Sequence, residues 1–136
     1  MDKISRDARS KNMAAIRSRD TNPEIIVRRL AHRLGFRFRL HRKDLPGKPD
    51  LVFPRLKKAI FVHGCFWHQH PDPRCADGRM PKSRLEYWEP KLRRNMQRDV
   101  DAQCALADMG WGSLTIWECE IADMDALESR LIGFLH

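Results

Sequence analysis

Four side chains that bind soft metal ions stand at suggestive spacing in this chain. Four residues separate Cys65 from His70, four more separate His70 from Cys75, and Cys119 follows much later. Thiolates and an imidazole in a set of four are typical ligands of tetrahedral zinc, and a site with four protein ligands is of the structural type. The spacing therefore predicts a Zn²⁺ site that joins a loop to a distant strand end.

Two further residues compete for places in this set. His68 could replace His70, but His70 lies midway between Cys65 and Cys75. Cys104 falls on the apolar side of a predicted helix, which favours an ordinary packed cysteine.

A carboxylate and two histidines form a second group with catalytic potential. Asp50 opens a predicted strand, where it could hold a hard cation such as Mg²⁺, with phosphate oxygens and a main-chain carbonyl completing the shell. It could equally be a turn former after Pro49. His63 and His68 follow the next strand, and imidazoles titrate near neutrality, so they could act as general base and general acid or be bystanders.

Two aromatic side chains, Phe66 and Trp67, stand between these histidines in a polar, cation-rich loop. They could form a small satellite core under the loop. The alternative is a wedge that enters a base stack, as apolar side chains of DNA-bending proteins do. Trp88 and Met13 are further candidates for such a wedge.

Hydrophobic periodicity predicts the elements that must position these residues. Helices are expected at residues 5–18, 22–34, 83–109 and 123–135. Strands are expected at residues 36–40, 50–53, 59–62 and 112–117. Residues 63–82 have no periodicity, and such a run inside a compact domain is usually functional or organised by metal. The order of elements predicts an α/β domain over residues 1–136, with a mixed central sheet flanked by helices.

Two of the helices carry start signals. Asn22 is the expected cap of one, with Pro23 and Glu24 in its first turn. Ser83 and Glu86 fit a capping box for the next helix. Its expected core-side residues are Leu92, Met96, Val100 and Ala107.

Composition and charge exclude several classes of protein. The chain is 42% hydrophobic and 32% charged over 136 residues, which suits one globular core and not wholesale disorder. No apolar stretch approaches the roughly 20 residues of a membrane helix. The N-terminus MDKISRDARSK has no apolar core of a signal peptide, so we expect a cytoplasmic protein with no membrane partner and with reduced cysteines rather than disulfides.

Positive charge is concentrated in the first two thirds of the chain. Residues 1–50 carry net +8 and residues 51–98 net +7, whereas residues 99–136 carry net −7. This asymmetry indicates that one face meets a polyanion, with nucleic acid favoured. A solvated, arginine-rich helix surface would give the same composition.

Six short blocks, in order along most of the chain, resemble one known family. The blocks are RSKNM (9–13), LPGKPDLVF (45–53), FVHGCFWH (61–68), LEYWEPKL (85–92), MGW (109–111) and WEC (117–119). They are similar to the very-short-patch-repair (Vsr) DNA mismatch endonucleases, and FVHGCFWH together with PGKPD is the specific part. The resemblance implies a PD-(D/E)xK restriction-endonuclease-like fold. It also implies a Mg²⁺-dependent enzyme, associated with the bacterial nucleoid, that nicks double-stranded DNA 5′ to the T of a T:G mismatch and so starts repair of deaminated 5-methylcytosine.

The same resemblance implies a role for each candidate residue. Asp50 and the main-chain carbonyl of Val62 would bind Mg²⁺, and Glu24 would touch the waters on that ion. His63 and His68 would be the catalytic histidines, with His68 as the water activator. The wedge beside the mismatch would consist of Met13, Phe66, Trp67 and Trp88. The structural zinc ligands would be Cys65, His70, Cys75 and Cys119. The basic helix within residues 1–20 would contact DNA.

The chain departs from the expected patterns in two places. The superfamily motif has an acid and a lysine where this chain has Phe61 and His63, so histidines must do what the lysine does. The four residues between His70 and Cys75 exceed the family spacing, so residues 71–74 must bulge if Cys75 is a ligand.

Two rival functions stay open at this point. One is a nuclease of the same fold that acts on another damaged or restriction-type site, and the other is a zinc-stapled DNA-binding module without catalysis. A monomer is expected, because a single asymmetric mismatch gives no two-fold reason to dimerise. The flanking bases, and whether mismatch-repair proteins take part, are not fixed by these residues.

Overall fold

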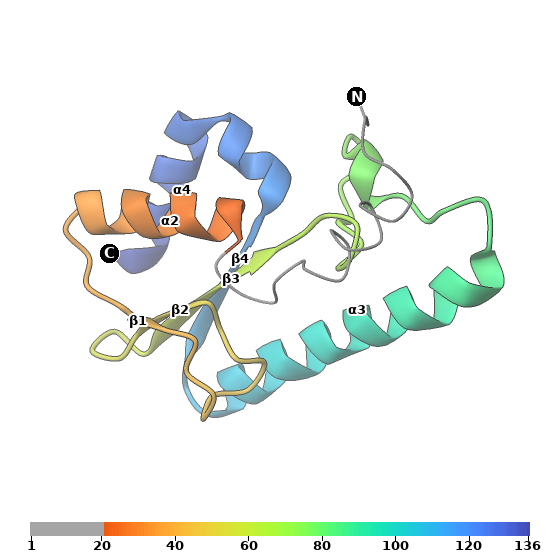
Figure 1. The fold of residues 1–136 in the computed structure, drawn as a ribbon. Helices are drawn as coiled ribbons and strands as arrows, with labels where there is room; N and C mark the ends of the chain where they lie inside the picture. The colour runs from red at the N-terminus through yellow and green to blue at the C-terminus, as the bar shows by residue number, and fades with distance from the viewer. Residues whose placement is uncertain (1–20) are drawn as a thin grey trace.

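The computed structural model describes residues 21–136 and contains a four-stranded mixed sheet with three α-helices (Figure 1). The expected helix at residues 5–18 and Met13 lie outside the described residues. The strands are β1 (Arg39–Leu40), β2 (Leu51–Phe53), β3 (Lys58–His63) and β4 (Gly112–Trp117). The helices are α2 (Asn22–Arg33), α3 (Leu85–Asp108) and α4 (Met124–Leu135), with short 3₁₀ helices η1 (Ala76–Gly78) and η2 (Glu118–Ala122). The predicted mixed sheet flanked by helices is confirmed.

The order of the strands explains why Asp50 and His63 lie at the same end of the sheet. The sheet runs β1-β2-β3-β4, in which β2 pairs antiparallel with β3 and β4 pairs parallel with β3. Because β2 and β3 are antiparallel, the start of β2 lies beside the end of β3, and the N–H of Asp50 donates to the carbonyl of Ile60 at 3.0 Å. The parallel pair requires a long crossover, which α3 provides.

Alternation along the strands divides the core between the two faces of the sheet. Leu51, Phe53 and Ile60 face α2 and α4 in the larger cluster, while the intervening Val52 and Phe61 face α3 in the smaller one. Figure 1 shows α2 and α4 on one side of the sheet and α3 on the other. The full membership of the larger buried cluster is Val27, Leu30, Ala31, Leu51, Phe53, Ile60, Ile116, Leu127, Leu131 and Leu135.

Several predicted boundaries differ from the structure. The cap of α2 is Thr21 and not Asn22, and it makes no side-chain cap hydrogen bond. Only Arg39–Leu40 of the expected strand 36–40 pairs with β2. Helix α3 begins at Leu85 after Arg84, whose φ of 53° is left-handed, so the predicted capping box does not form.

The predicted core side of α3 is largely wrong. Leu92 is fully buried as expected, but Met96 and Val100 are 38% and 54% exposed and Cys104 and Ala107 are also exposed. The residues that turn inward are Leu92, Asn95, Asp99, Ala102 and Leu106. Two of these are polar, so the apolar periodicity predicted the wrong buried face of α3. Among residues 21–136 no helix is long and apolar enough to cross a bilayer.

Candidate active site

Two acidic side chains lie close together at the start of β2. Asp50 directly precedes this strand, and its Oδ2 accepts a hydrogen bond from the N–H of Val62 at 2.7 Å. Glu24 comes from the first turn of α2 and is only 2% exposed. Its carboxylate pairs with Arg28 and lies 3.3 Å from Nε2 of His41. Donor atoms of Glu24, His41 and Asp50 all lie within 4.8 Å of one another.

The surroundings of Asp50 favour its uncharged form. Burial, followed by the hydrogen bond with Glu24, raises the pKa of Asp50 to about 8, although the N–H of Val62 and the charge of Arg28 oppose the shift. A divalent cation would reverse this preference because it stabilises the ionised carboxylate. Oxygen donors of this kind suit a hard cation such as Mg²⁺. The residues present therefore fit the metal that the resemblance implies.

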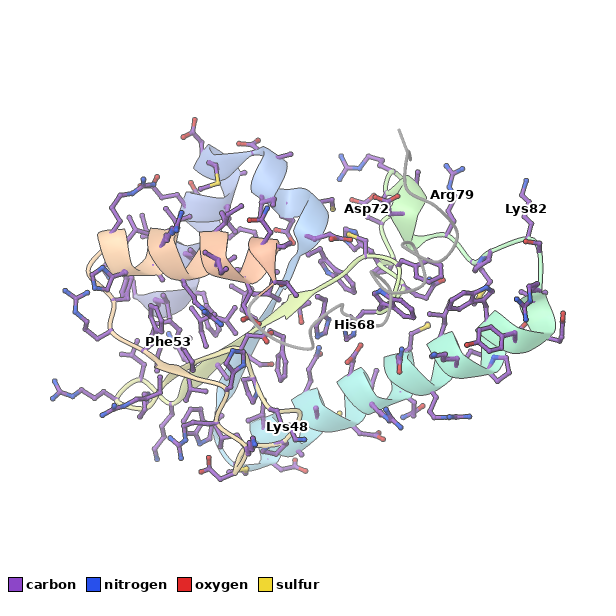
Figure 2. The ribbon with its side chains drawn as sticks, viewed as in Figure 1. Lys48, Phe53, His68, Asp72, Arg79 and Lys82 are labelled. Carbon is purple, nitrogen blue, oxygen red and sulfur yellow. The ribbon has the colours of Figure 1, made fainter. Side chains whose placement is uncertain are left out.

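A stacked pair of histidines stands at the end of β3. The rings of His63 and His68 are nearly parallel, with centroids 3.8 Å apart. Nδ1 of His68 lies 2.7 Å from Oδ2 of Asp99 in α3, and Nε2 of His63 lies 3.8 Å from the other oxygen of that carboxylate. Figure 2 shows His68 between the sheet and α3. Asp99 was not predicted from the sequence, although its polar character on the inner stripe with Leu92 and Ala102 could have indicated it.

The two histidines differ in their protonation and in their hydrogen bonds. Burial first, and then the neighbouring His68, lowers the pKa of His63 to about 4, against the opposing charge of Asp99. His63 is therefore neutral at pH 7, and within residues 21–136 its buried Nδ1 has no hydrogen-bond partner. A carboxylate can only accept, so Asp99 holds the proton of His68 on Nδ1 and leaves Nε2 as the acceptor in the neutral ring.

One open cavity of about 1160 Å³ brings these groups together. Asp50, Val62, His63, His68 and Asp99 line it. Lysine and arginine side chains also line it, namely Lys43, Lys48 and Arg98. Carboxylate, imidazole and cationic groups around one cavity can bind an anionic substrate and move a proton on it.

The predicted aromatic wedge residues form one cluster beside this cavity. The ring centroids of Phe66, Trp67 and Trp88 lie between 5.2 and 5.8 Å apart in edge-to-face contacts. All three are only half-buried, and Phe66 and Trp67 line the cavity. Trp88 comes from α3, and the structure places it beside the two loop aromatics, the grouping that the resemblance implies. Lys91 lies 5.7 Å from the ring centre of Trp67, a cation–π contact.

The structure brings together all four predicted zinc ligands. Nδ1 of His70 lies 3.4 Å from Sγ of Cys119 and 3.8 Å from Sγ of Cys65. Metal bonds of about 2.3 Å to sulfur and 2.0 Å to nitrogen place tetrahedral ligands about 3.5 Å apart. Cys75 also lies within 4.8 Å of the others. The competing residues lie elsewhere, because Cys104 is exposed on α3 and His68 belongs to the histidine pair.

The chemistry of these thiols also fits a metal site. Burial is the main cause that raises the pKa of Cys65 to about 12, and it raises that of Cys119. Both would be neutral thiols at pH 7 without a cation, and a bound Zn²⁺ would favour the thiolates. Gly78 lets the returning loop pass against His70, since a Cβ there would lie 2.5 Å from the carbonyl oxygen of His70.

The mixed sheet, the paired carboxylates and the cation-lined cavity suit a hydrolase that acts on an anionic polymer. Sequence comparisons identify the family to which this class of enzyme belongs. A model of the family described as DNA mismatch endonuclease Vsr matches residues 1–74. The type II nicking enzyme V.XorIIP of Xanthomonas oryzae pv. oryzae is 51% identical over 134 residues, which cover 98% of this chain and 96% of that protein.

Two further relatives agree with this result. The type II nicking enzyme V.NaeI of Lentzea aerocolonigenes is 44% identical over 133 residues, 94% of this chain and 76% of that protein. The DNA mismatch endonuclease Vsr of Escherichia coli is 38% identical over 124 residues, 91% of this chain and 78% of that protein. The chain belongs to the Vsr family of endonucleases and is a DNA endonuclease.

Proposed function

We propose that this endonuclease is Mg²⁺-dependent and nicks one strand of duplex DNA 5′ to the T of a T:G mismatch. It would thereby start very-short-patch repair of deaminated 5-methylcytosine. Membership of a family whose Escherichia coli member is named a mismatch endonuclease supports this specificity. The basic charge of residues 1–98 supports a DNA partner held through its phosphates.

One observation carries the proposal above the rest. The cavity that holds Asp50, His63 and His68 is also lined by Phe66 and Trp67. Chemistry at a phosphate and distortion of the base stack could therefore occur at one place. A wobble pair costs less to unstack than a matched pair, so a wedge at this position would favour mismatched DNA.

The catalytic roles are assigned to the following groups. Asp50, with the main-chain carbonyl of Val62, would hold Mg²⁺, and Glu24 would accept hydrogen bonds from the waters around it. When bound, the ion supplies Lewis-acid polarisation of the scissile phosphate.

Proton transfer falls to the histidine pair. Nε2 of His68, oriented by Asp99, would take the proton from the water that attacks phosphorus. Neutral His63, which lines the same cavity, would help at the phosphate. The P–O3′ bond breaks and the departing O3′ takes a proton from a solvent water, which leaves a 5′-phosphate and a 3′-hydroxyl.

The remaining groups would hold the DNA and the loop. Phe66, Trp67 and Trp88, with Met13 from outside the described residues, would enter the stack at the mismatch. Zn²⁺ held by the cysteine–histidine cluster would fix the loop that carries Phe66 and Trp67. We further propose a monomer with a single nuclease domain over residues 1–136, whose first 20 residues contact DNA.

The test uses labelled duplexes that differ at one position, with a T:G, a U:G or a matched T:A pair. We expect one nick, on the T strand of the T:G duplex, that requires Mg²⁺ and disappears with Asp50→Ala. Equal nicking of all three duplexes would refute mismatch specificity but keep the nuclease. Binding without any nick under these conditions would refute the proposed reaction on this DNA.

A second candidate function is site-directed nicking of matched DNA, and its test needs one additional duplex. Two of the relatives above are named type II nicking enzymes, a name that does not mention mismatches. A fully matched duplex carrying many short sequence contexts would reveal a site-directed nick. A nick that depends on sequence and not on the mismatch would favour this alternative.

A further inference from the structure

The loop before β2 brings a lysine to the cavity in an unusual way. Gly47 and Lys48 are consecutive left-handed residues, with φ of 76° and 49°. Leu45 anchors the loop as a member of the smaller core cluster, and the N–H of Lys48 donates to its carbonyl at 3.1 Å. The two left-handed residues turn the chain between this anchor and Asp50.

The turn is packed tightly against the rest of the protein. A Cβ on Gly47 would lie 2.6 Å from the Cβ of Ala102 in α3 and 3.0 Å from the ring of Phe61 in β3. Only glycine therefore allows this approach between the loop, α3 and β3. The close packing of Gly47 against Ala102 and Phe61 fixes the turn directly before Lys48, and Figure 2 shows Lys48 in this loop beside α3.

The charge of Lys48 is not used within the described part of the chain. No hydrogen bond or ion pair of its ammonium occurs among residues 21–136. Asp44, a carboxylate of the same loop, is already paired with Arg42, whose Nε donates to it at 3.0 Å. Lys48 is exposed and lines the cavity together with Asp50, His63 and His68.

A left-handed lysine is not evidence by itself. Lys57, in the turn between β2 and β3, has a φ of 53° and is also exposed. That turn closes the opposite end of the β2–β3 hairpin from Asp50, and Lys57 does not line the cavity. Lys48 differs because a packed turn holds it at the rim of the cavity. Non-glycine residues in strained conformations tend to occur where a site requires them.

We propose that Lys48 is a substrate-contacting residue whose ammonium binds a backbone phosphate of the cleaved strand, at or next to the phosphate that Asp50 serves. The contact supplies a cation from the loop before β2 to the cavity that His63 and His68 also line. It rests on the proposed active site around Asp50. Its chemistry is a charge-assisted hydrogen bond to a phosphate oxygen, which any duplex nicked by the protein offers.

The test compares Lys48→Asn with the matched control Lys57→Asn. Asparagine tolerates a left-handed backbone, so each variant removes one charge from a similar conformation with little added strain. Single-turnover nicking and DNA binding are measured over a range of salt, using the duplex that the unchanged protein nicks fastest. Thermal unfolding of each variant checks the fold, and Lys48→Gly replaces Lys48→Asn if the latter is destabilised.

We expect Lys48→Asn to lower kcat/KM by about 10- to 100-fold, the range of one hydrogen bond to a charged group. The slope of log binding constant against log salt should fall by about one, because one phosphate contact is lost. Lys48→Arg should keep the slope, and Lys57→Asn should change the rate less than about twofold.

Two outcomes would overturn the proposal. In one, Lys48→Asn behaves as Lys57→Asn does in both rate and slope. In the other, both variants lose rate and slope equally, which would mean a diffuse effect of charge. Asp50→Asn is run beside them, and normal nicking by that variant would refute the proposed active site, whatever Lys48 does.

Discussion

The two groups of candidate metal ligands near the end of β3, one around Asp50 and one around Cys65, are held in different ways. Asp50 and Glu24 are positioned by a strand start, a helix first turn and the buried cores around them. The cluster of Cys65, His70, Cys75 and Cys119 joins a loop with little secondary structure to the first residues after β4. In the first cluster the surrounding fold holds the metal-ligating side chains in place. In the second cluster the metal-ligating side chains, joined by a metal, would have to hold the loop in place.

This difference teaches what a metal would contribute at each place. A cation at Asp50 would add chemistry to a site that already has its shape. A cation at the cysteines would add stability, because it would cross-link the loop to the segment that follows β4. Loss of either metal should therefore give distinct phenotypes, one in catalysis and one in folding.

The largest expected effect is on catalysis, from Asp50→Asn. This change removes the charged donor but keeps its size, so we expect nicking to fall by more than about 10³-fold while the fold is retained. Duplex binding, measured by fluorescence anisotropy, should change by less than a few-fold. If the variant lost binding and melted early, Asp50 would be structural, and the contrast between the clusters would disappear.

The next effect is on stability, from Cys119→Ser. Structural zinc sites contribute about 10 kcal/mol or more to folding in small zinc domains. We therefore expect loss of bound zinc, measured by atomic absorption, and a melting temperature lower by more than about 10 °C. Cys104→Ser is the matched control, because this exposed thiol lies outside the cluster and should leave both values unchanged. Full zinc content in Cys119→Ser would contradict the assignment.

A smaller effect on catalysis is expected from Asp99→Asn. Asp99 is a positioning residue, because it acts through Nδ1 of His68 at 2.7 Å. We expect kcat to fall by about 10- to 100-fold with little change in KM. In a His68→Asn background the same change should add almost nothing, since the two act as one unit. Additive losses in this double-mutant cycle would show that Asp99 works independently of His68.

The smallest effect is a dependence of stability on pH. Burial and Glu24 raise the pKa of Asp50 to about 8 in the folded protein, from an ordinary value of 3.8. The protonated form is thus favoured by folding, so its stabilisation is complete below about pH 4 and is lost as the pH rises through 8.

Melting temperatures of zinc-loaded protein without added Mg²⁺ test this directly. Asparagine cannot ionise, so Asp50→Asn should melt above the unchanged protein by a margin that grows by at least about 5 °C between pH 5 and pH 8.5. A margin that is constant over this range would argue against the raised pKa. Added Mg²⁺ should shrink the margin, because it would bind only the carboxylate.

The described elements show where local patterns are sufficient. The end of α2 near Gly35, the strands around Leu51 and Ile60, and the position of α4 to within one residue all follow from local patterns in the chain. Asp123 accepts from the N–H of Ala126 at 3.1 Å, as a capping residue should. The inner face of α3 did not follow, because its polar residues Asn95 and Asp99 turn toward the site and break the apolar stripe.

The sequence by itself determined the kinds of donor in this protein and the segments that carry them. Soft thiols in one loop and a carboxylate before a strand can be recognised from residue types and spacing, which are local properties. Only the tertiary structure decided that Asp99 orients His68 and that Lys48 lines the same cavity as His63 and His68. These meetings depend on how α3 and the loop before β2 pack on the sheet, and packing between distant segments leaves no periodic signal in the chain.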